Sequence, residues 1–279
     1  MIILAFIMVA SVFDYPIVAQ TTLPYDVDFT YSYSGVVKVL NNPGVTTKMK
    51  LIIEKGENKY IYNISNNANY VSFPLQLGSG KYVVKLYENT TGTKYKTVYS
   101  ESSDVTIYNS NSAYLASTQQ VNWNENNDAI ALAKKLLNDA LWVKIVTTRN
   151  NHAKLTEKEK IDILYNYVVK NMDYDYNKIE TLSYDYVPDI DVVLKAKKGI
   201  CFDYSVLLAA MLRSQGIPTK LIKGESTNTD VYHAWNEIYL SSENRWIIVD
   251  TTYDAYMHDN KKSYSMEKPV NQYTKQLEF

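Results

Sequence analysis

Three side chains in the carboxy-terminal half of the chain have the types and order needed for acyl transfer. Cys201, the only cysteine among 279 residues, lies in the run Gly199–Ser205, and His233 and Asp250 follow it. A thiolate can attack an amide carbonyl, an imidazole can take up and return the proton, and a carboxylate can orient the imidazole. The pattern predicts a catalytic site that works through a thioester.

The residues after Cys201 predict a helix that begins at the cysteine. Its apolar side would be formed by Val206, Leu207, Ala210 and Met211, and Gly216 and Pro218 are typical of a helix end. A helix start offers unpaired N–H groups and the positive end of the helix dipole, which stabilise a thiolate. The Cys201 amide could also donate to an oxyanion. Asp203 lies in the first turn, where it would stabilise the helix start but oppose a thiolate if the two side chains faced each other.

His233 and Asp250 are expected on neighbouring antiparallel strands. Alternation places His233 and Trp235 on one face of a strand over 231–240, and Asp250 lies on a strand over 245–252. The short connection 241–244 is typical of a hairpin, which would bring the carboxylate beside one imidazole nitrogen and leave the other for Cys201.

Three aromatic residues are candidates for lining the substrate site or for donating to the oxyanion: Trp235, Tyr174 and Tyr204. Trp235 could exclude water or line the acyl site. Tyr174 belongs to a Tyr- and Asp-rich loop over 172–188, where packing is the alternative role. His152 and His258 are expected on the surface.

Composition excludes several classes of protein. The net charge of −1 gives no basic surface for a nucleic acid. One cysteine allows no internal disulfide, and three scattered histidines without a second cysteine make a structural zinc site unexpected. The 26 tyrosines, against 6 phenylalanines, favour packing at sheet surfaces over a platform for carbohydrates or bases.

The amino terminus resembles an export signal over residues 1–20. An apolar run from Ile2 to Phe13 ends at Asp14, and residues 17–19 could precede cleavage before Gln20. No Lys or Arg precedes the run, so a membrane anchor is the alternative, although the run is short for a membrane span.

The pattern of the remaining chain predicts two domains, an all-β immunoglobulin-like sandwich over 24–110 and an α+β domain over 113–279. A polar segment, 109–112, separates them. In the second domain, a helix around 130–141, a helix that begins at Thr156 with a capping box, and a short helix over 189–197 precede the cysteine helix. The expected strands are 29–33, 49–53, 59–64, 70–77, 82–87, 95–99 and 105–108 in the sandwich, and 219–224, 231–240 and 245–252 in the second domain.

Residues of about 120–260 resemble the transglutaminase-like superfamily, whose core uses papain-like Cys-His-Asp chemistry. The resemblance is carried by 199–205, by Gly-Ile-Pro at 216–218, by His-Ala-Trp-Asn-Glu at 233–237 and by 246–252, where Thr251 replaces the usual proline. It implies Cys201 as nucleophile, His233 as base and Asp250 as orienting residue. An amino-terminal sandwich before such a core is similar to secreted bacterial members of the superfamily.

The expected activity is that of an exported cysteine peptidase or amidase that attacks peptide or glutamine-type amides and passes the acyl group to water. The alternatives are an amine-accepting transglutaminase and a non-catalytic cell-surface binding protein that keeps the fold. No cofactor is expected. The resemblance also implies no metal, because the calcium sites of the animal crosslinking enzymes lie in segments that this chain does not match. The expected partner is a protein or peptide substrate, with a cell-wall peptide as one candidate, and membrane contact only through an amino-terminal anchor.

Overall fold

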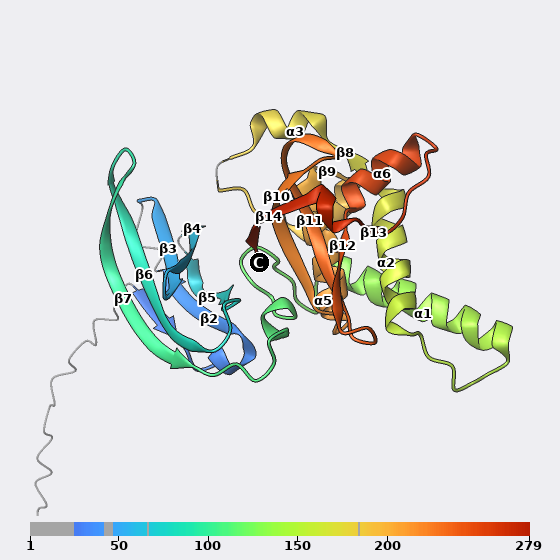
Figure 1. The fold of residues 1–279 in the computed structure, drawn as a ribbon, viewed down its shortest axis with the longest axis horizontal. Helices are drawn as coiled ribbons and strands as arrows, with labels where there is room; N and C mark the ends of the chain where they lie inside the picture. The colour runs from blue at the N-terminus through green and yellow to red at the C-terminus, as the bar shows by residue number, and fades with distance from the viewer. Residues whose placement is uncertain (1–24, 42–46, 66, 184) are drawn as a thin grey trace, which may run out of the picture.

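A β-rich amino-terminal part lies beside a mixed α/β carboxy-terminal part in the computed structural model (Figure 1). The structure describes residues 25–41, 47–65, 67–183 and 185–279. The predicted export signal lies outside the described residues. None of the helices among the described residues is both long and apolar enough to cross a membrane.

Two antiparallel sheets face each other in the amino-terminal part. Their inward side chains share one core, in which the Tyr62 and Phe73 rings, one from each sheet, lie 5.0 Å apart. One sheet has the order β1-β2-β5 and the other β4-β3-β6-β7. The strands are β1 (Tyr25–Asp28), β2 (Val36–Asn41), β3 (Met49–Lys55), β4 (Asn58–Ile64), β5 (Asn67–Pro74), β6 (Gly80–Thr91) and β7 (Lys94–Val105).

The first predicted strand, 29–33, is wrong. Asp28 ends β1 because its carboxylate accepts from the Thr30 amide at 2.7 Å, which turns the chain into a short 3-10 helix, Ser32–Ser34. The alternating residues that follow, Val36–Asn41, form β2 instead. The two strands expected over 95–108 are one strand, β7, because it pairs with β6 from Thr91 and Lys94 at the turn as far as Gly80 and Val105.

The first two helices of the carboxy-terminal part are α1 (Asp128–Thr148) and α2 (Glu157–Asn171). The predicted capping box of α2 is present: the Glu159 amide donates to Thr156 Oγ1 at 3.2 Å, and the Thr156 amide donates to Glu159 at 2.7 Å. The buried faces of both helices, which include Ile130 and Leu164, contribute to the common core. These contacts hold α1 and α2 against the cysteine helix.

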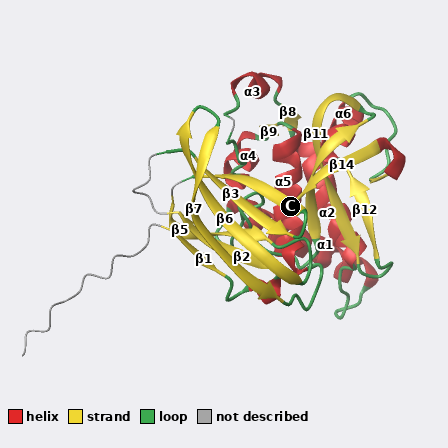
Figure 2. Ribbon diagram, turned by 60° about the vertical axis from the view of Figure 1, so that its left-hand side comes forward, coloured by secondary structure: helices red, strands yellow, loops and turns green. Residues whose placement is uncertain are grey.

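The cysteine helix, α5 (Cys201–Ser214), packs on one face of a five-stranded sheet (Figure 2). It ends as predicted, with Gly216 at φ 77° in the left-handed region. The sheet has the order β13-β12-β11-β10-β14, which confirms a mixed helix-and-sheet organisation. Its strands are β10 (Thr219–Ser226), β11 (Thr229–Leu240), β12 (Arg245–Val249), β13 (Glu267–Lys268) and β14 (Tyr273–Glu278).

Several short elements were not anticipated from the sequence. The loop expected over 172–188 contains β8 (Asp173–Tyr174) and α3 (Tyr176–Thr181), and β8 pairs in parallel with β9 (Lys198–Gly199) directly before the cysteine helix. The strand expected to run to Thr252 stops at Val249, because Asp250 caps a further helix, α6 (Thr251–Asp259). The short helix expected over 189–197 is α4 (Ile190–Ala196).

Buried Arg213 and the end of β14 connect the two parts of the molecule. The guanidinium donates to the carbonyls of Ala116, Thr219 and Phe279 at 2.8–2.9 Å. The Phe279 ring lies 5.7 Å from that of Tyr62 in the sandwich. Burial lowers the pKa of Arg213 to about 9, and the three carbonyls satisfy its donors. The sandwich is therefore held against the sheet by specific side chains.

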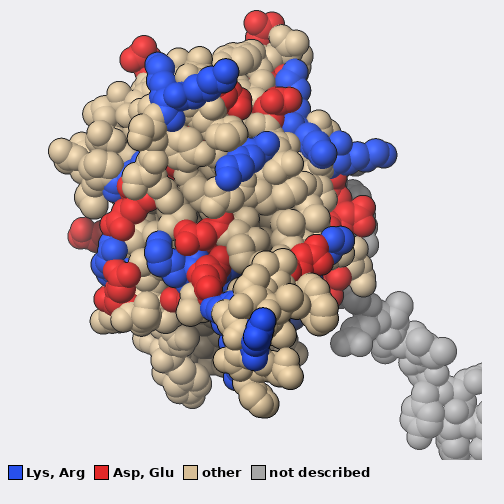
Figure 3. Space-filling model, turned by 90° about the vertical axis from the view of Figure 1, so that its right-hand side faces the viewer, with Lys and Arg blue, Asp and Glu red and all other residues tan. Residues whose placement is uncertain are grey.

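Charges are mixed on the surface. On the face turned to the viewer in Figure 3, Lys and Arg side chains are interspersed with Asp and Glu and with uncharged residues.

Candidate active site

The structure places Cys201 at the first position of α5, half-buried, with Ile200 as the capping residue. The helix starts here because the Asp203 carboxylate folds back and accepts from the Ile200 amide at 2.7 Å. Gly199 makes room for this carboxylate, since a Cβ at Gly199 would lie 2.5 Å from the Cβ of Asp203. The hydrogen bond between Asp203 and the Ile200 amide thus fixes the start of the helix and with it the position of Cys201.

Asp203, in the first turn of the same helix, does not face solvent. Its side chain is fully buried and accepts from Lys178 at 2.7 Å and from the Tyr186 hydroxyl at 2.5 Å. The short helix α3, which was not foreseen, supplies Lys178. Because the lysine neutralises this carboxylate, a negative charge two residues from Cys201 does not oppose a thiolate.

His233 lies on β11 and Asp250 directly after β12, and the register of the two strands brings them together. His233 Nε2 lies 2.8 Å from Asp250 Oδ2. The imidazole is 6% exposed and the carboxylate is fully buried. Cys201 acts on the same imidazole, since its interaction and its charge contribute to raising the pKa of His233. Cys201, His233 and Asp250 therefore form a row in which His233 is bonded to Asp250 and interacts with Cys201.

The interactions of His233 and Asp250 favour the charged form of both side chains. Burial alone would lower the pKa of His233, but the bond and the charge of Asp250, together with Cys201, raise it to about 10. Burial likewise opposes ionisation of Asp250, yet His233, the Tyr253 amide and the Tyr273 hydroxyl lower the pKa of Asp250 below its ordinary value. The arrangement can hold an imidazolium beside the Asp250 carboxylate.

Tyr273 is a residue of the site that sequence reasoning missed. It comes from β14, more than twenty residues after Asp250, and its hydroxyl donates to Asp250 Oδ2 at 2.9 Å. Asp250 Oδ1 accepts from the Tyr253 amide at 3.0 Å. No local signal in the sequence could have found Tyr273, because the contact depends on the pairing of β14 with β10.

The three aromatic candidates have different surroundings. Trp235 is 1% exposed and stacks behind His233, with ring centroids 6.2 Å apart, so it shields the imidazole and does not line the cavity. Tyr204 lines the cavity, but its hydroxyl donates to the Met172 carbonyl at 2.7 Å. Tyr174 also lines the cavity, and burial, with a contribution from the charge of Cys201, raises the pKa of Tyr174 to about 12. Tyr174 remains a candidate donor.

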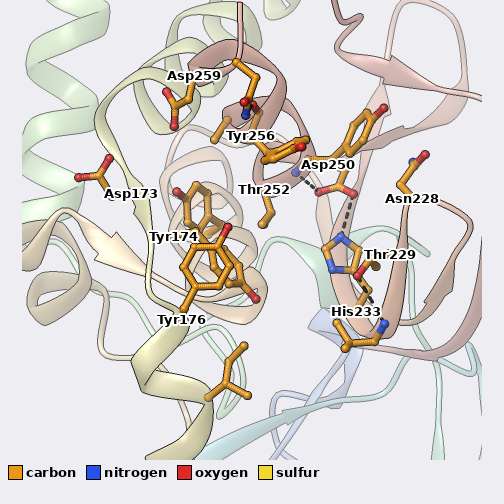
Figure 4. Close-up of a pocket in the computed structure, with 16 residues that line it drawn as sticks. Asp173, Tyr174, Tyr176, Asn228, Thr229, His233, Asp250, Thr252, Tyr256 and Asp259 are labelled. Carbon is orange, nitrogen blue, oxygen red and sulfur yellow. Dashed lines mark hydrogen bonds and ion pairs between the residues drawn. The ribbon is translucent and has the colours of Figure 1, made fainter. Parts of the chain in front are cut away.

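A cavity of about 650 Å³ opens beside His233 and Asp250. Figure 4 shows these two residues on one side of it, with Tyr174 and Tyr176 across the space. Cys201 is not among the lining residues. The walls of the cavity come from β8, α3, α5, β11 and α6. The short elements that were not foreseen from the sequence therefore form most of its lining.

Lys223 on β10 was also missed. Burial lowers the pKa of its amine to about 8, and the charge of Cys201 partly opposes this shift. Its Nζ lies 3.6 Å from the centre of the Phe202 ring and donates to Gln120 at 3.2 Å.

His152 and His258 are exposed, outside the row of site residues. Among the described residues, no three His, Cys, Asp or Glu side chains are grouped to hold a metal ion.

Residues 144–251 match the sequence model of the transglutaminase-like superfamily. The match spans α5, β10, β11 and β12 and includes Cys201, His233 and Asp250.

One curated relative is UPF0252 protein MJ1282 of Methanocaldococcus jannaschii. It is 26% identical over 130 residues, which cover 43% of this chain and 33% of that protein. The alignment therefore spans about a third of the relative's length.

Solved structures with a similar arrangement share little sequence with this chain. A proposed cysteine protease from Cytophaga hutchinsonii is 15% identical over 84% of this chain and 77% of that chain, with a TM-score of 0.41. The periplasmic domain of TgpA from Pseudomonas aeruginosa is 13% identical over 75% and 90%, with a TM-score of 0.36. Red sea bream transglutaminase is 12% identical over 78% and 48%, with a TM-score of 0.33. These likenesses are too remote to support an argument about activity.

Proposed function

We propose that this protein is a thiol-dependent enzyme that cleaves peptide or glutamine-type amides through a thioester on Cys201 and passes the acyl group to water. The observation that carries the proposal is the connected row of Cys201, His233 and Asp250, with the cysteine at a helix start. Each member comes from a different element, and a structural role for any one of them would not require the other two.

The reaction follows from the roles of these atoms. The Cys201 thiolate attacks the amide carbon, and the Cys201 amide, with Tyr174 as a second candidate, donates to the developing oxyanion. The carbon–nitrogen bond breaks, and the imidazolium of His233 gives its proton to the leaving amine. His233 then takes a proton from water, whose oxygen attacks the thioester. The acid leaves, and the thiolate of Cys201 and the imidazolium of His233 are restored. Asp250 keeps the imidazole oriented throughout.

An amine in place of water would make the same site a transglutaminase, which is the second candidate activity. The row of three side chains acts identically in both, and the acceptor decides between them.

We further propose that the chain comprises an amino-terminal immunoglobulin-like domain over 24–110 and a catalytic domain over 113–279, and that it acts outside the cytoplasm. The sandwich proposal is supported by its two facing sheets of three and four strands. The apolar segment 1–20 supports export, with a membrane anchor as the alternative.

Trapping of the acyl-enzyme tests the activity. The protein is incubated with a peptide mixture, quenched with acid and digested, and the Cys201 peptide is searched for an added acyl mass. We expect the adduct in the intact chain and its loss in His233→Ala, with His152→Ala as a matched control that keeps it. Supply of a labelled primary amine distinguishes transfer from hydrolysis. If no adduct forms and iodoacetamide alkylates Cys201 equally fast in both histidine variants, the protein is a binding protein that retains the fold.

A further inference from the structure

The far end of the cavity beside His233 combines aromatic walls with acidic side chains. Its lining includes Tyr174, Tyr176 and Tyr256, and two carboxylates, Asp173 and Asp259. In Figure 4 both carboxylates lie on the side of the cavity away from His233. Burial raises the pKa of the Tyr204 phenol, and the negative charges of Asp173 and Asp259 raise it further. Both carboxylates therefore lie close enough to the same phenol to affect its ionisation.

No lysine or arginine of the described chain forms an ion pair with either carboxylate. The nearby lysines have other partners: Lys178 pairs with buried Asp203 at 2.7 Å, and Lys198 pairs with Asp175 at 3.3 Å. Lys262 lies over the Tyr256 ring at 5.7 Å, which occupies one face of that ring. The acidic end of the cavity therefore keeps its negative charge available for a ligand.

Asp259 is unfavourable for the helix that carries it. It is the last residue of α6, where the helix dipole is negative and a cation is preferred. The sequence thus places a carboxylate where the local electrostatics oppose it, on the same side of the cavity as Asp173.

The rim of the cavity is unusually apolar for an exposed surface. Tyr176, Val231, Tyr256 and Ile179 are 48–69% exposed and all line the cavity. Aromatic and aliphatic walls suit a methylene chain, and tyrosine rings also attract a cation. A side chain with an apolar stem and a positive end fits both features at once.

We propose that this cavity is a subsite for a basic side chain, lysine or arginine, of the peptide substrate. The inference rests on the proposed function for its connection to the reaction. The stem lies among Tyr174, Tyr176 and Tyr256, and the cationic end lies between Asp173 and Asp259. The peptide backbone then passes His233 toward the thiol, so the subsite selects amides close to a basic residue.

Binding to an inactive variant tests the subsite without requiring chemistry. Cys201→Ala protein is titrated with Nα-acetyl-lysine methylamide, with the uncharged norleucine analogue and with the glutamate analogue, and affinity is followed by NMR chemical shifts. Exposed charge pairs give small energies, so we expect the lysine probe to bind roughly fivefold more tightly than the norleucine probe, and the glutamate probe to bind most weakly.

The carboxylate variants make the test specific. Asp173→Asn with Asp259→Asn, in the Cys201→Ala background, should remove the preference for lysine and leave norleucine binding unchanged. Asp104→Asn, an exposed carboxylate on β7 in the sandwich, is the matched control and should keep the preference. Equal binding of the lysine and norleucine probes, or a preference that survives the double substitution, overturns the proposal.

A reactive probe separates this proposal from the proposed function. Tripeptide chloromethyl ketones carrying lysine or norleucine at each position in turn are reacted with the chain that retains Cys201. We expect at least one lysine position to accelerate labelling about fivefold. If the lysine derivative binds selectively but no acyl-enzyme forms with any peptide, the subsite holds and the activity fails. If acyl-enzyme forms without charge preference, the activity holds and the subsite fails. Incorporation of labelled butylamine that depends on Asp173 and Asp259 would assign the cavity to an amine acceptor and overturn the peptide assignment.

Discussion

His233 Nε2 lies 2.8 Å from the fully buried carboxylate of Asp250, and this bond keeps the imidazole both oriented and protonated. The same carboxylate oxygen accepts from the Tyr273 hydroxyl at 2.9 Å. The pair therefore links the pH dependence of stability to the proposed chemistry.

Asp250→Asn should lower the pKa of His233, because burial then acts without the opposing negative charge. Turnover is expected to fall by about 100-fold or more, the usual range for losing an acid–base group. Tyr273→Phe removes only one hydrogen bond to the carboxylate and should give a smaller loss. Steady-state rates of the chain and the two variants check this order, and a Tyr273→Phe loss as large as that of Asp250→Asn would contradict it.

The raised pKa of His233 also predicts a pH dependence of stability. The folded protein holds the imidazole proton up to about pH 10, whereas an unfolded histidine releases it near 6.5. This contribution is complete below pH 6.5 and is lost as the pH rises through about 10. Urea unfolding of the wild-type chain and of His233→Gln should converge as the pH rises through this window, and a constant difference would refute the linkage.

Lys178→Met should destabilise the protein and slow alkylation of Cys201. The substitution leaves the fully buried Asp203 carboxylate without its lysine, and removing one partner of a buried pair typically costs about 3 kcal/mol. Lys198→Met is the matched control, because its bond to Asp175 is more exposed and should cost less than about 1 kcal/mol. Urea denaturation gives both values. Equal effects of the two substitutions would show that Lys178 does not neutralise a buried charge.

Gly199→Ala should disturb the start of the cysteine helix, although Gly199 itself lies before the helix. The added Cβ would lie 2.8 Å from Asp203 Oδ2, so the carboxylate must move from the Ile200 amide. Overpacking of this kind costs about 1–3 kcal/mol, and alkylation of Cys201 should change as well. Gly56→Ala, which has open space but a left-handed backbone at φ 60°, should affect stability alone. If the reactivity of Cys201 is unchanged in Gly199→Ala, Asp203 does not determine the position of the cysteine.

Local rules in the sequence were enough for the elements that carry the three chemical groups. The capping box at Thr156, the left-handed Gly216 and the strand over 231–240 follow from short-range patterns, and the structure contains each of them. Residue identity likewise defined the candidates Cys201, His233 and Asp250, because few side chains perform acyl transfer.

Tertiary structure decided what surrounds these groups. Asp203 is buried because Lys178 reaches it from a short helix, and Tyr273 meets Asp250 because β14 pairs with β10. Each contact joins residues 23 or 25 positions apart that no local period connects. A side chain's charge and type are set by the sequence alone, but its burial and its partner depend on which distant element packs against it.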